Sequence, residues 1–139
     1  MFVLDTNVVS ELRKARTTKI NPGVAAWGTS VAPHRLFISA ITLMELEMGV
    51  LSKERTDTQQ ARILRQWLNG TVLPAFTGRI LPVDDSVAIA CAGMHVPDRK
   101  SERDALIAAT AAVRGMIVVT RNTQDFEGTG VQLLDPFTA

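Results

Sequence analysis

Short apolar runs alternate along this chain with segments of helical periodicity, and this alternation constrains the fold more than any other feature. Continuous apolar runs are typical of strands that are buried on both faces. Strands separated by helices pair in parallel through right-handed crossovers, which predicts a three-layer α/β/α sandwich around a parallel sheet of about five strands. The predicted strands are residues 1–4, 36–38, 79–83, 116–120 and 131–134.

Helical spacing of apolar residues places the helices between these strands. Pro22 suits the first turn of a helix, and Gly115 suits the position just after a helix C-terminus. The pair Asn69-Gly70 is expected to end the helix that precedes it. The predicted helices are residues 8–14, 22–30, 41–51, 59–68, 85–94 and 101–114.

Composition indicates one globular domain over all 139 residues, with 46% hydrophobic and 21% charged residues. The net charge of +1 neither favours nor excludes a nucleic acid as partner. Cys91 is the single cysteine, so an internal disulfide is impossible and a reducing, cytoplasmic location is expected. A signal peptide is not expected, because the N-terminus has no basic region followed by a long apolar region, and a membrane span is not expected, because there is no uncharged apolar run of roughly 18 residues.

Four acidic residues stand where predicted elements meet, and the expected fold brings their positions together. The carboxyl ends of parallel strands lie along one edge of a sheet, where ligands bind beside a reversal of strand order. If the reversal lies next to the first strand, the first and fourth strands are neighbours about 4.8 Å apart, and the third is two positions away. That distance argues against Asp84 and Asp85 as site residues. The four candidates are Asp5 after the first strand, Glu45 and Asp104 early in two helices, and Asp125 after the fourth strand.

Each of these acids also has a structural interpretation that requires no ligand. An acid before a helix can cap it, an acid three residues after Ser or Thr can complete a capping box, and an acid in a turn can bond to its own backbone. The matches are Asp5 and Asp84 as caps, Thr42 with Glu45 and Ser101 with Asp104 as capping boxes, and Asp125 with Asn122 as a turn.

Clustering of these carboxylates would favour a site for a hard divalent cation. Two carboxylates 4 Å apart repel each other by roughly 4 kcal/mol at an effective dielectric of 20, so several stay ionised together only beside a cation. Mg²⁺ and Mn²⁺ prefer oxygen ligands, and carboxylate-bound divalent ions hydrolyse phosphodiesters. His34 and His95 are isolated in the sequence, which argues against zinc.

Three segments of the sequence resemble PIN-domain ribonucleases, and most closely the VapC-type toxins of bacterial toxin–antitoxin pairs. The segments are FVLDTNVVSEL, SAITLMELEMGV and RDALIAATAAVRGMIVVTRNTQDFEGTGV, which follow the family's order over nearly the whole chain. The resemblance implies a PIN-like fold and a metal-dependent endoribonuclease that cleaves RNA as a toxin. It also implies a Mg²⁺ or Mn²⁺ cofactor, a small antitoxin partner and a homodimer.

The resemblance assigns the catalytic and metal-binding acids to Asp5, Glu45 and Asp104. At the fourth acid this chain departs from part of the family, because Asn122 stands where some members carry Asp. The fourth ligand is therefore Asp125, the side-chain carbonyl of Asn122, or neither of them directly. A solvated surface is the alternative interpretation for the basic residues near the site. The substrate-binding candidates are Thr6, Arg103, Arg121 and Asn122.

Two rival functions make different demands on the sequence. An aspartyl-phosphate enzyme of the haloacid-dehalogenase type needs a second acid two residues after Asp5, where this chain has Asn7. A response regulator needs paired acids before its phosphorylated aspartate, and that pattern is absent too. A PIN fold that binds RNA or protein without cleaving it is the second alternative, because Asn122 replaces an acid.

Overall fold

The computed structural model describes residues 1–138, and within them it contains a five-stranded sheet whose neighbouring strands are all parallel. The strand order is β3-β2-β1-β4-β5, which places β1 in the centre. The predicted parallel sheet and the predicted pairing of the first and fourth strands are both confirmed. The strands are β1 Phe2–Leu4, β2 Leu36–Ser39, β3 Ile80–Leu81, β4 Ile117–Val119 and β5 Leu133–Leu134.

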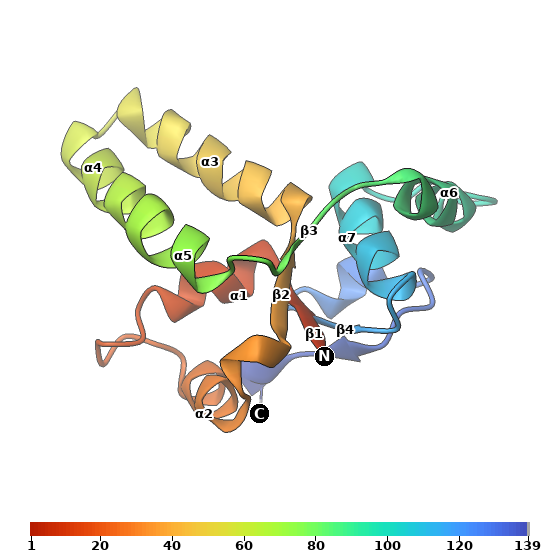
Figure 1. Ribbon diagram of the computed structural model, residues 1–139, viewed down its shortest axis with the longest axis horizontal. Coiled ribbons are helices and arrows are strands. Elements are labelled where there is room, and N and C mark those ends of the chain that lie inside the picture. Colours follow the sequence, from red (N-terminus) through yellow and green to blue (C-terminus); the bar gives the residue numbers. More distant parts are fainter. Residues whose placement is uncertain (139) are drawn as a thin grey trace.

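Helices connect the strands and cover the sheet (Figure 1). The α-helices are α1 Thr6–Leu12, α2 Pro22–Ser30, α3 Ala40–Glu54, α4 Thr58–Trp67, α5 Leu73–Ala75, α6 Asp85–Met94 and α7 Glu102–Ala112. Shorter turns are the 3-10 segments η1 Pro33–Arg35, η3 Thr123–Phe126 and η4 Pro136–Thr138, and the π-helical turn η2 Leu68–Val72. Among residues 1–138, no helix is long and apolar enough to span a membrane.

Alternate residues of the central strands point into two separate cores, and this produces the predicted three layers. Phe2 and Leu4 of β1 join a core with residues of α1, α3 and η2, and Val119 of β4 points the same way. Val3 and Val118 point to the opposite face, where they pack against the Ala-rich α7. The alternation follows from the two-residue period of a strand, and burial of both faces explains why these strands are apolar throughout.

The helices α3 and α4 form an antiparallel arm that extends from the body of the molecule (Figure 1). Arg65 of α4 donates two hydrogen bonds to the Glu47 carboxylate of α3, each 2.7 Å long. The predicted helix end at Asn69-Gly70 is wrong, because the chain continues through them as η2. Leu68 and Val72 of this turn are buried in the core. Their burial outweighs the low helix propensity of glycine, which costs about 1 kcal/mol.

The predicted capping box of Thr42 and Glu45 is also wrong. The N-cap of α3 is Ser39, whose hydroxyl accepts a hydrogen bond from the Ile41 amide at 3.0 Å. Thr42 is therefore inside the helix, and Glu45 lies a turn beyond its start. Its carboxylate does not cap α3 and is free to face the edge of the sheet.

Asp84 caps α6, as its position in the sequence predicts. Its carboxylate accepts a hydrogen bond from the Val87 amide at 3.0 Å. The strand before it, β3, lies two positions from β1, as the expected strand order requires.

Candidate active site at the carboxyl edge of the sheet

Asp5 anchors the site at the end of the central strand. The β1–β4 register pairs Leu4 with Val119, so the next residues, Asp5 and Thr120, leave the sheet side by side. One Asp5 carboxylate oxygen accepts from the Thr6 amide at 2.8 Å, which makes Asp5 the N-cap of α1. The other oxygen accepts from the Thr120 hydroxyl at 2.8 Å and from the Asn7 side-chain amide at 3.2 Å. The cap interpretation is confirmed, and it holds the carboxylate at the sheet edge.

The environment of Asp5 disfavours its negative charge. Burial raises the pKa of the Asp5 carboxyl from its ordinary value of 3.8, although the hydrogen bonds from Thr120 and Thr6 act in the opposite direction. The charge of Glu45 raises the Asp5 pKa further. A cation beside Asp5 would offset both effects.

Thr120 is a site residue that the sequence reasoning missed. Its hydroxyl is fully buried, donates to Asp5 and accepts from the Asn122 amide at 3.0 Å. Because the Asn122 amide can only donate, the hydroxyl hydrogen of Thr120 is directed to Asp5. The side-chain carbonyl of Asn7 accepts from the Arg121 amide at 3.1 Å, which ties α1 to the loop after β4. The signal for Thr120 was its place at the end of the IVVT strand, one residue beyond the apolar run.

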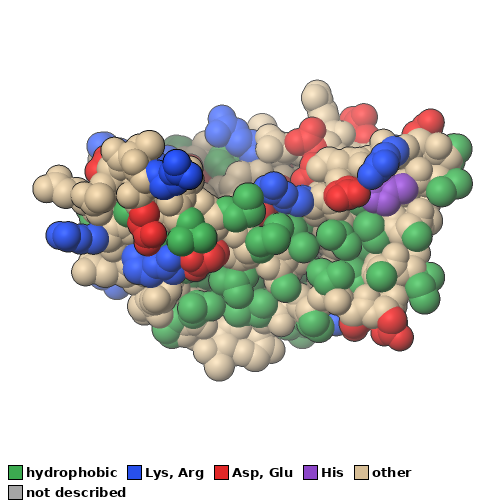
Figure 2. Space-filling model, turned by 90° about the horizontal axis from the view of Figure 1, so that it is seen from above, with side chains coloured by type: hydrophobic (Ala, Val, Ile, Leu, Met, Phe, Trp, Pro, Cys, Tyr) green, Lys and Arg blue, Asp and Glu red, His purple; other side chains and the backbone are tan. Residues whose placement is uncertain are grey.

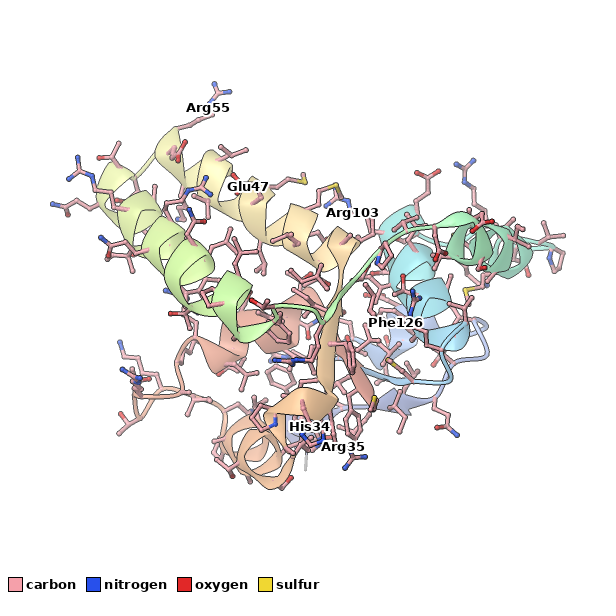
Figure 3. All side chains as sticks on the ribbon, viewed as in Figure 1. His34, Arg35, Glu47, Arg55, Arg103 and Phe126 are labelled. Carbon is pink, nitrogen blue, oxygen red and sulfur yellow. The ribbon has the colours of Figure 1, made fainter. Side chains whose placement is uncertain are left out.

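Glu45 reaches the same edge from α3, and two groups hold its carboxylate. One oxygen accepts from the Thr6 hydroxyl at 2.7 Å. The other accepts from the Arg103 guanidinium of α7 at 3.3 Å. Figure 3 shows Arg103 between the N-terminal half of α3 and the start of α7. The structure therefore brings together Glu45 and two of the predicted substrate-binding candidates, Thr6 and Arg103, and it links them through Thr6 to Asp5.

The ionisation of Asp104 is influenced by the charges of the other three acids. It is half-buried in the first turn of α7. Burial raises the pKa of its carboxyl from 3.8, and the negative charges of Asp5 and Asp125 raise it further, with a smaller contribution from Glu45. The four acids lie far apart in the sequence, yet the charges of the other three disfavour the ionised form of Asp104. The structure thus places Asp104 within electrostatic reach of the other three acids, and a common metal site of all four stays a prediction.

The four acids are near one another without forming a closed set of ligands. Among residues 1–138, no three acidic, histidine or cysteine side chains are close enough to hold an ion as they stand. Glu45 is held by Thr6 and Arg103, and Asp125 is exposed in η3. The donor chemistry nevertheless fits Mg²⁺ or Mn²⁺, because the groups are carboxylate oxygens with surplus negative charge. Within the described residues, no ion pair involves Asp5, Asp104 or Asp125.

The remaining substrate-binding candidates lie on the loop after β4. The Arg121 guanidinium lies over the ring of Phe137, 5.1 Å from its centroid. Asn122 is exposed, and its backbone amide donates to the Thr120 hydroxyl. The Asp125 amide donates to the Asn122 carbonyl at 3.0 Å, so a local turn is confirmed there. Arg121 and Asn122 thus border the acidic edge, but neither side chain contacts an acid of the site.

Comparison with known proteins agrees with this geometry. The chain matches the PIN domain family over residues 2–131. The VapC ribonuclease Y4jK of Sinorhizobium fredii is 38% identical over 146 residues, which cover 99% of this chain and 98% of that protein. Toxin FitB of Neisseria gonorrhoeae is 34% identical over 142 residues, with 99% of each chain covered. The crystal structure of FitAcB from Neisseria gonorrhoeae superposes with a TM-score of 0.89 at 33% identity and covers 100% of both chains.

The family match covers most of the chain, and the relatives align along nearly their whole length. The solved structure shares the full fold at the same level of identity. The chain therefore belongs to the PIN-domain family, in the branch that contains the VapC ribonucleases and the FitB toxin.

Proposed function

We propose that this protein is an endoribonuclease toxin that cleaves RNA at a Mg²⁺ or Mn²⁺ site formed by its acidic edge. The observation that carries the proposal is the match to the PIN domain family and its VapC ribonuclease relatives. The geometry supports it, because Thr6 links Asp5 to Glu45. In addition, α7, which carries Asp104, packs against β1 and α3, so that acidic side chains gather at one edge. Such an arrangement is unfavourable by itself and becomes favourable when a divalent cation binds. When bound, the ion would polarise a water molecule for attack on the phosphate and stabilise the leaving oxygen.

Each acid has a distinct part in this proposal. Asp5 is the fixed ligand, because three hydrogen bonds orient its carboxylate. Glu45 and Asp104 complete the site from α3 and α7. We assign the fourth ligand to Asp125 rather than Asn122, because a carboxylate is the stronger ligand for Mg²⁺ and η3, which carries Asp125, packs against α7. Asn122 instead uses its backbone to position Thr120.

The groups around the acids suit an RNA backbone. Arg103 borders the acids directly, and a guanidinium can bind a phosphate through two parallel hydrogen bonds. Arg121 lies farther out, stacked on Phe137, where it can meet a neighbouring phosphate of the strand. Thr6 and Asn122 supply polar groups between these positions. We assign the four residues to substrate binding in this sense.

A melting-temperature titration with Mn²⁺ tests the metal site. At a hundredfold excess over its dissociation constant, a native-state ligand adds roughly 2.7 kcal/mol, which raises the melting temperature of a domain this size by several degrees. We expect this rise in the wild type and in Glu102→Gln, an exposed acid on the same helix turn. We expect Asp104→Asn to lose it.

The same titration separates the proposal from its alternative. A melting temperature unchanged by Mn²⁺ in all three proteins would favour a PIN fold that binds RNA without cleaving it. Asp5, Glu45 and Asp104 all lie at the expected edge, so no observation favours that alternative.

An antitoxin and a second copy of the chain are the proposed protein partners, and the cytoplasm is the proposed location. The antitoxin is supported by neighbouring structures of FitAB and VapBC assemblies. The second copy is supported by exposed apolar side chains on α3, namely Met44 at 41%, Met48 at 43% and Leu51 at 49% exposure. Figure 2 shows hydrophobic side chains gathered across the face of the molecule seen from above. Contiguous apolar surface of this kind marks interaction sites.

Sedimentation velocity tests the homodimer. We expect a dimer in the wild type at micromolar concentration, and a shift toward monomer when Met48 is replaced by Glu, because a charge would be buried in the interface. The matched control is Ala112→Glu, an exposed position at the end of α7. A wild-type monomer at high micromolar concentration would contradict the dimer.

A further inference from the structure

One ion pair links α3 and α7, two helices that border the candidate site. Arg103, at the start of α7, donates to Glu45 of α3 at 3.3 Å, across 58 residues of sequence. The second oxygen of Glu45 accepts from the Thr6 hydroxyl. Each carboxylate oxygen of Glu45 thus has one partner in this structure, a hydroxyl on one oxygen and a guanidinium on the other. Figure 3 shows the Arg103 side chain in this gap.

Arg103 differs in this respect from the other arginine beside it. Arg99 precedes α7, and its guanidinium binds Glu102 at 2.9 Å, where both side chains are more than two-thirds exposed. Arg103 is 48% exposed and Glu45 only 24% exposed, so their contact lies closer to the body of the site. Arg99 therefore provides an internal comparison, with the same charge and the same region of the chain but no contact with the acids.

We propose that Arg103 is an exchangeable counter-ion for Glu45, which a divalent cation displaces, and that the released guanidinium then binds an RNA phosphate beside the site. The proposal rests on the proposed function, because it needs a metal and RNA at the same edge. It adds that metal binding precedes release of Arg103, and that metal binding and RNA binding are coupled. The metal and the guanidinium compete for one Glu45 oxygen, and the two cations repel each other once the metal is bound.

The strength of the pair suits such an exchange. Partly exposed ion pairs are weak, and one of this kind shifts an equilibrium constant by up to about fivefold. A divalent ion with several carboxylate ligands overcomes this readily. Arg103 directly precedes Asp104 in the sequence. Its displaced guanidinium therefore remains within reach of a phosphate bound at the metal. Metal binding then strengthens RNA binding, and RNA strengthens metal binding by the same factor.

Calorimetric titration of Mn²⁺ without RNA tests the competition. We expect Arg103→Gln to bind Mn²⁺ about three- to fivefold more tightly than the wild type, because Arg103 no longer occupies an oxygen of Glu45. Arg99→Gln loses the same charge without touching Glu45, and its affinity should stay within about twofold of the wild type. Arg103→Lys keeps the cation and should bind Mn²⁺ more weakly than Arg103→Gln. Melting curves in EDTA verify that all variants are folded.

Binding of a nuclease-resistant 2′-O-methyl phosphorothioate oligonucleotide tests the second half. In EDTA, the wild type and Arg103→Gln should bind it within about twofold of each other, because Arg103 is paired with Glu45. With Mn²⁺, the wild type should bind about fivefold more tightly than Arg103→Gln. The wild-type dependence of log affinity on log salt should then be steeper by about 0.7, as expected for one added phosphate contact on a single strand.

The outcomes separate this inference from the proposed function. If the wild type binds Mn²⁺ and both Gln variants match it, the exchange is overturned while the metal site stands. If Arg103→Gln weakens oligonucleotide binding equally with and without Mn²⁺, Arg103 is a permanently free cation, and the exchange is again overturned. If the wild type fails to bind Mn²⁺ at all, both proposals fall together.

Discussion

Replacement of Asp104 by Asn is expected to reduce RNA cleavage by a factor on the order of 10³, while the protein stays folded. The substitution keeps the shape of the side chain but removes one of the charges that would hold the metal. Cleavage rates of a labelled RNA with Mn²⁺ in excess provide the measurement, and Glu102→Gln on the same helix turn is the control. Retention of more than about a tenth of the wild-type rate would exclude Asp104 from the catalytic set.

The same variant should be more stable than the wild type when no metal is present. The folded-state pKa of Asp104 is raised above 3.8, so ionisation at neutral pH is less favourable in the folded protein than in the unfolded chain. Stability linked to Asp104 is therefore complete below pH 3.8 and is lost as the pH rises through the folded pKa. In EDTA we expect Asp104→Asn to melt at a higher temperature than the wild type at pH 7, and this gap to close toward pH 4.

A second large effect is expected in the core, where Phe126→Ala should destabilise the protein by about 3–5 kcal/mol. Phe126 is only 1% exposed, ends η3, and packs with Val3, Ile107 and Val118 under α7 (Figure 3). Removal of the ring leaves a cavity that the surrounding helix and sheet can fill only partly. Thermal unfolding should show a fall in melting temperature of roughly 10 °C or more.

Phe126 also anchors the segment that carries a proposed metal ligand, since it directly follows Asp125 in η3. The Phe126→Ala protein should therefore show a smaller Mn²⁺-induced rise in melting temperature than the wild type. Ile89→Ala is the control, because Ile89 is 75% exposed and its truncation should change stability by no more than about 0.5 kcal/mol. If Phe126→Ala lowers the free energy of unfolding by less than about 1 kcal/mol, the prediction is wrong, because the core then closes around the missing ring.

The positions of Asp5, Glu45 and Asp104 were predictable from the sequence because strand ends and helix starts fix them. An apolar strand that ends just before Asp5 places that acid at the carboxyl edge of the sheet. The parallel topology places the helix starts that carry Glu45 and Asp104 at the same edge. The partners of these acids were not predictable in the same way. The hydrogen bond from Thr120 to Asp5 and the ion pair from Arg103 to Glu45 depend on register and helix rotation, which local patterns do not encode.

The wrong predictions of secondary structure have the same origin, because they were also made from local patterns. Asn69-Gly70 carries a strong local signal for a helix end, but the burial of Leu68 and Val72 keeps the helical turn going. Thr42 matches the spacing of a capping box, yet Ser39 caps the helix one turn earlier by accepting from the Ile41 amide. In contrast, α2 and α6 begin and end where the sequence predicts, because Pro22 and Asp84 each provide a helix-start signal with no competitor nearby.

The central place of β1 between β2 and β4 also has a consequence for synthesis of the protein in the cell. Asp5 is made first, but its neighbour Thr120 follows 115 residues later, so the edge that gathers the acids exists only after β4 has left the ribosome. A chain still being translated therefore carries the first acid without the rest of its site. Any nuclease activity that depends on this edge therefore waits until β4 has emerged and paired with β1.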